Sequence, residues 1–83
     1  MEKIDALFMP EKTDHYLSDL GAEVLKLARK AQKDATGSCD AFAKGRQTAF
    51  YEALSLMKKQ AEVFELDSKA IGLSGIDLDE LLQ

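Results

Sequence analysis

Two stretches decide the fold of this 83-residue chain: Asp14–Ala35, DHYLSDLGAEVLKLARKAQKDA, and Asp40–Glu65, DAFAKGRQTAFYEALSLMKKQAEVFE. Placed on a helix at about 100° per residue, the apolar residues of each stretch fill roughly half of the circumference. A helix that packs against a single neighbour needs an apolar stripe of only about 100°. Each predicted helix is therefore expected to contact at least two partners.

The two apolar arcs differ in one respect, because the second contains polar residues. The first arc comprises Tyr16, Leu17, Leu20, Gly21, Val24, Leu25, Leu27, Ala28, Ala31 and Ala35. The second comprises Phe42, Ala43, Ala49, Phe50, Ala53, Leu54, Leu56, Met57, Ala61, Val63 and Phe64. Arg46 and Gln60 fall inside the second arc. The small residues in both arcs permit close helix approach, and Gly21 predicts a packing contact because glycine costs a helix about 1 kcal/mol relative to alanine.

The ends of the two helices carry recognisable signals. Thr13 or Asp14 is expected to cap the first helix, and Gly37 is suited to the left-handed position that follows its end. Ser38 or Asp40 can cap the second helix. The connection between the two helices is only a few residues long, so the pattern predicts an antiparallel hairpin.

Shorter elements are expected at both ends of the chain. Met1–Met9 carries apolar residues with helical spacing, Ile4, Leu7 and Phe8, and this short helix should stop before Pro10. Residues 67–72 read as one capped helical turn, and Asp77-x-x-Glu80 as the start of a last turn bearing Leu78, Leu81 and Leu82. The Leu-x-x-Leu-Leu form of that turn resembles helical docking peptides, but the shortage of core in so small a chain favours docking onto its own hairpin.

The chain is predicted to be one all-α domain, residues 1–83, built on a long antiparallel helical hairpin with short N- and C-terminal helices. A single core of this size gives only a small margin of stability, which favours oligomerisation. Two hairpins that bury their open sides against each other would form a four-helix bundle, and we expect this homodimer. The alternative is a compact monomer in which the terminal segments cover the hairpin.

The composition indicates the cellular setting of the chain but does not identify its function. The chain is 46% hydrophobic and 31% charged, with a net charge of −4, which argues weakly against attraction to nucleic acid over the whole surface. Cys39 is the only cysteine, so the sequence gives no sign of an oxidising compartment and favours the cytoplasm. No apolar run approaches a membrane span, and the acidic start is unlike a signal peptide, so we expect no association with a membrane.

Four cations form the clearest candidate for binding an anion or an acidic partner. Lys26, Arg29, Lys30 and Lys33 lie on one helix face at i, i+3, i+4 and i+7, where a phosphate backbone could also lie. The simpler interpretation is a solvated face near a helix end, partly neutralised by Glu23 and Asp34. Arg46 is the fifth candidate: among apolar neighbours its guanidinium needs a carboxylate or a bound anion, unless its stem extends past the hairpin end into water.

Enzymatic chemistry is not predicted. The only histidine, His15, and the only cysteine, Cys39, are separated by more than about 30 Å along the first helix, so they cannot form a dyad within one chain. The sequence holds no metal-ligand pattern or phosphate-binding glycine loop, and we expect no cofactor. The predicted function is a small non-enzymatic protein-interaction or regulatory module that acts as a homodimer, with another protein as a further candidate partner. The alternative is a regulator that binds nucleic acid through the basic stripe.

Overall fold

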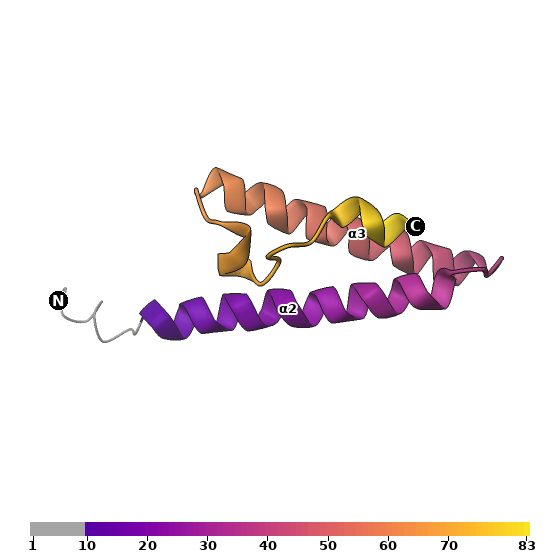
Figure 1. The fold of residues 1–83 in the computed structure, drawn as a ribbon, viewed down its shortest axis with the longest axis horizontal. Helices are drawn as coiled ribbons and strands as arrows, with labels where there is room; N and C mark the ends of the chain where they lie inside the picture. The colour runs from indigo at the N-terminus through magenta and orange to yellow at the C-terminus, as the bar shows by residue number, and fades with distance from the viewer. Residues whose placement is uncertain (1–9) are drawn as a thin grey trace.

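The computed structural model describes residues 10–83, and these are all-helical, as predicted (Figure 1). Two long helices, α2 (Pro10–Ala35) and α3 (Ala41–Val63), form an antiparallel hairpin. Two short 3₁₀ helices follow, η1 (Ser68–Ile71) and η2 (Leu78–Leu82). The short helix predicted at Met1–Met9 lies outside the described residues.

The start of α2 differs from the prediction. The helix begins at Pro10, so Thr13 and Asp14 lie inside it and the capping role expected for them is wrong. Proline suits a first helical position, because its fixed φ angle is already helical and its missing N–H would have no helical partner there. Pro10, which predicts the end of a helix before it, is therefore also suited to begin the next helix.

The connection between the helices follows the sequence prediction closely. Gly37 has a φ of 72°, in the left-handed region that ends a helix. Asp40 caps α3, and its carboxylate accepts a hydrogen bond from the Phe42 N–H at 3.0 Å. Ser38 supports this cap, since its hydroxyl accepts a hydrogen bond from the Asp40 N–H at 2.9 Å. At its other end α3 stops at Val63, two residues before the predicted end, and Glu65 adopts a φ of 59°.

The C-terminal segment docks onto the hairpin, which confirms the prediction. Asp67 and Asp77 cap η1 and η2 respectively, and Gly72 ends η1 in the left-handed conformation. Leu73 and Leu81 are each only 1% exposed, so the tail supplies the core that a two-helix hairpin lacks. The residues of the core cluster are Ala28, Leu54, Ala61, Ile71, Leu73, Ile76, Leu78 and Leu81.

Close backbone packing fixes η1 against α2. A Cβ atom at Gly21 would overlap the carbonyl oxygen of Ile71, and one at Gly72 would overlap the carbonyl oxygen of Ser18. The packing contact predicted from Gly21 is thus confirmed, and its partner is a backbone carbonyl. In Figure 1 η1 (orange) lies between the helices where they diverge, away from the Thr36–Asp40 connection.

Two glutamines, one from each long helix, hold η2 in place. The Gln32 amide donates a hydrogen bond to the Glu80 carbonyl at 2.6 Å, and the Gln47 amide donates one to the Leu81 carbonyl at 2.7 Å. Carbonyl groups at a helix end have no partner within the helix and are stabilised by such donors. The tail therefore covers one side of the α2–α3 groove and leaves the other side uncovered.

Candidate interaction surface

The uncovered side of the hairpin can be located from the helix geometry. Gln32 and Gln47 mark the side of each helix that faces η2. At about 100° per residue, Leu20 and Leu27 lie roughly 120–140° around α2 from Gln32. On α3, Ala53 and Gln60 lie a similar roughly 120–140° from Gln47. We call this uncovered side of both helices the open face.

The open face is rich in large apolar side chains. Seven of them on the face and its α3 edge are between 41% and 74% exposed: Tyr16, Leu20, Leu27, Phe42, Leu56, Val63 and Phe64. Single apolar residues on a surface are ordinary, but several large ones gathered on one side of a hairpin indicate an interaction surface. The chain itself thus buries only part of the wide apolar arcs predicted from the sequence.

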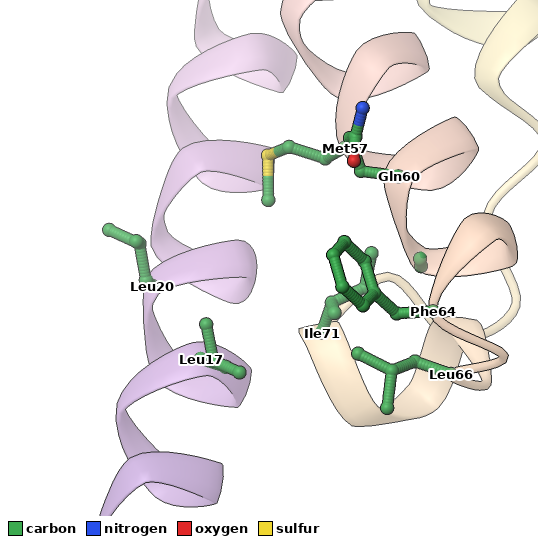
Figure 2. A pocket seen from close by; sticks show the side chains of 8 residues that line it. Leu17, Leu20, Met57, Gln60, Phe64, Leu66 and Ile71 are labelled. Carbon is green, nitrogen blue, oxygen red and sulfur yellow. The ribbon is translucent and has the colours of Figure 1, made fainter.

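A pocket opens on this face where the two helices diverge (Figure 2). Its volume is about 200 Å³, and the side chains of Met57 on α3 and of Phe64, just after the end of α3, point toward α2. The lining residues are Leu17, Leu20, Met57, Gln60, Ala61, Phe64, Leu66 and Ile71. Only Gln60 brings a polar side chain to it, so the pocket is suited to an apolar group and not to acid–base or nucleophilic chemistry.

Arg46 lies on the open face toward the tip of the hairpin, where its guanidinium contacts a carboxylate. Its Nη1 atom lies 3.4 Å from Oδ2 of Asp34, and its guanidinium carbon lies 5.8 Å from the centre of the Phe50 ring. The side chain is 31% exposed, which is intermediate between the buried and the solvated positions predicted for it. The charge is therefore balanced within the chain, and no bound anion is needed to explain Arg46.

The four cations of the basic stripe are all exposed on α2. Two of them are paired with carboxylates on the same helix: Lys26 Nζ lies 3.1 Å from Glu23, and Lys30 Nζ lies 3.3 Å from Asp34. Asp34 is thus shared between Lys30 and Arg46. Arg29 and Lys33 stand beside them on the solvated surface. The four cations do lie on one helix face, but two of them already contact carboxylates of the same helix.

The residues considered for chemistry are not brought together. His15 lies near the start of α2 and Cys39 in the connection at the hairpin tip, and both are exposed. Among residues 10–83, no group of histidine, cysteine and acidic side chains is arranged to hold a metal ion. Neither long helix in this part of the chain is apolar enough to cross a membrane.

The open face and its pocket are the most distinctive surface of the described residues. A comparison of the chain with known protein families, curated proteins and solved structures found no match. The apolar surplus was predictable from the sequence, whereas the pocket was not. Its existence depends on the angle at which the helices diverge and on the insertion of η1 between them, and neither has a local sequence signal.

Proposed function

We propose that this chain is a small non-enzymatic protein-interaction module that acts as a homodimer, in which the open faces of two hairpins pack together as a four-helix bundle. The observation that carries this proposal is the set of large exposed apolar side chains on the open face and its α3 edge. The tail already covers the opposite side of each hairpin, so the bundle would be completed by one further pair of helices.

The size of the open face supports a second copy as its occupant. Large side chains present on the order of 150–250 Å² each when fully exposed, so at their exposed fractions the seven apolar residues present on the order of 800 Å². A stable specific interface buries about 800 Å² on each partner. Burial of all seven side chains in a homodimer would therefore come close to the area of a specific interface.

The composition of the open face also favours burial. Ala49 and Ala53 are exposed on α3 and would let a neighbouring helix approach closely. Arg46 brings its own carboxylate, so burying it does not leave an unpaired charge. The free energy needed to desolvate the polar groups of the open face is therefore small compared with that needed to desolvate the charged groups of the basic stripe.

Sedimentation equilibrium tests the proposal. The wild-type chain is expected to be a dimer at micromolar concentration, and the double variant Leu27→Glu/Leu56→Glu to be a monomer with an unchanged helical circular dichroism spectrum. Leu82→Glu is the matched control, because Leu82 is 45% exposed but lies on η2, on the covered side. The control should remain a dimer. A wild-type chain that is a well-folded monomer at high micromolar concentration would contradict the proposal.

A further inference from the structure

Two contacts fix which residues of α2 and α3 lie level with each other. Asp34 lies beside Arg46, near the hairpin tip. Leu20 and Gln60 line the same pocket, near the opposite end. Leu27 is midway between the two α2 residues, and Ala53 is midway between the two α3 residues. Leu27 and Ala53 therefore lie level at the middle of the open face.

We propose that two copies pack their open faces antiparallel, about a two-fold axis near Leu27 and Ala53, so that Phe42 of each copy enters the apolar pocket of the other. This inference rests on the proposed homodimer and specifies its geometry. The hairpin tip of one copy would lie over the diverging ends of the other, and each pocket would be completed by Phe42 of the other copy.

Phe42 has the position and the exposure of an anchor. It lies as many residues before Ala53 as Phe64 lies after it, so the two-fold axis brings Phe42 level with Phe64 of the second copy. The side chain is 74% exposed, the largest exposed fraction among the large apolar residues of the described chain. Within one chain it cannot reach the pocket, since Ala61 lies about 28 Å farther along α3.

The pocket suits an aromatic ring. Its volume of about 200 Å³ and its apolar lining match what a phenyl group requires. An apolar cavity of about 150 Å³ lined by leucine, isoleucine and phenylalanine is known to bind benzene. The residues that contribute most to binding at a protein interface also tend to fill well-packed, desolvated pockets.

The same register gives compatible pairs at several further positions. Ala49 lies level with Met57 of the second copy, so a small residue meets a large one, and Ala53 meets Ala53 at the axis. Arg46 faces Gln60 of the second copy, whose amide oxygen can accept a hydrogen bond from the guanidinium. Lys30 comes near Glu23 of the second copy, which places opposite charges together. The parallel arrangement would instead leave Phe42 at the level of the other tip and the pocket unfilled.

An isotope-filtered NOE experiment on the full chain tests the geometry directly. In a sample that mixes labelled and unlabelled copies, we expect intermolecular NOEs between the Phe42 ring and the methyl groups of Leu20 and Ile71. The distance within one chain is too long to produce them. A dimer that lacks these NOEs overturns the inference while leaving the proposed homodimer standing. NOEs from the pocket to Ile4, Leu7 or Phe8 would assign it to the chain's own N-terminal segment and overturn the inference equally.

The substitution Phe42→Ala provides an independent measurement. Two anchors are lost in each dimer, so the dissociation constant is expected to rise at least roughly 100-fold. Leu82→Ala, which shortens an exposed side chain on the covered side, should leave it unchanged. An unchanged dissociation constant for Phe42→Ala in a folded dimer would reject Phe42 as the anchor, whereas a wild-type monomer would reject the homodimer and this geometry with it.

Discussion

Gln32 on α2 and Gln47 on α3 approach η2 from the two sides of the hairpin and donate hydrogen bonds to consecutive backbone carbonyls, those of Glu80 and Leu81. The last turn of the chain is thereby fixed to both long helices at once. Leu81 is buried in the core on this side of the hairpin. The side that these contacts leave uncovered is the open face.

Removal of one amide should loosen the tail without unfolding the hairpin. Gln47→Ala leaves the Leu81 carbonyl without its donor, and we expect a loss of about 1 kcal/mol in the free energy of unfolding. Backbone amides of residues 78–83 should exchange hydrogen faster than in the wild type, whereas those in the middle of α2 should not. Thr48→Ala is the control, since the Thr48 hydroxyl bonds only to the Lys44 carbonyl of its own helix. Equal protection of the tail in both variants would contradict the role of Gln47.

The two glycines within the long helices should respond oppositely to alanine. At Gly45 a Cβ atom would meet open space, so Gly45→Ala should stabilise the fold by about 1 kcal/mol through helix propensity. At Gly21 a Cβ atom would overlap the Ile71 carbonyl, so Gly21→Ala should destabilise the fold by about 1–3 kcal/mol despite the same gain. Urea denaturation of both variants measures the difference. If both substitutions are stabilising, η1 does not pack on α2 as described.

Much of the fold could be predicted because its signals are local. Helix periodicity, the Gly37 turn, the Asp40 cap and the two Asp-capped turns of the tail each depend on residues close in sequence. The start of α2 at Pro10 was missed because proline signals both a helix boundary and a first helical position. The ion pair between Asp34 and Arg46 and the glutamine hydrogen bonds to η2 join residues that are far apart in sequence. Helix periodicity carries no information about such pairs.

The ion pair between Arg46 and Asp34 should contribute little to stability. The two side chains are 31% and 42% exposed, and partly solvated pairs of this kind contribute at most about 1 kcal/mol. A double-mutant cycle with Arg46→Ala and Asp34→Ala should give a coupling energy below about 1 kcal/mol that declines further in molar salt. The unfolding measurements are best made on the Leu27→Glu/Leu56→Glu background, so that dimer formation does not contribute. A coupling of several kcal/mol would show that the pair is more buried than its exposure indicates.

The basic stripe on α2 is expected to be a solvated face, since Glu23 and Asp34 already offset Lys26 and Lys30. A protein that binds nucleic acid through several cations loses affinity steeply as salt rises, because each phosphate contact releases counterions. Titration of duplex DNA and RNA at several salt concentrations should therefore show no salt-dependent binding by the wild type. Lys26→Glu/Lys30→Glu should behave identically, as should Lys58→Glu/Lys59→Glu, which makes the same charge change on α3. Wild-type binding that weakens with salt, and that only the α2 variant abolishes, would instead establish the stripe as a nucleic-acid interface.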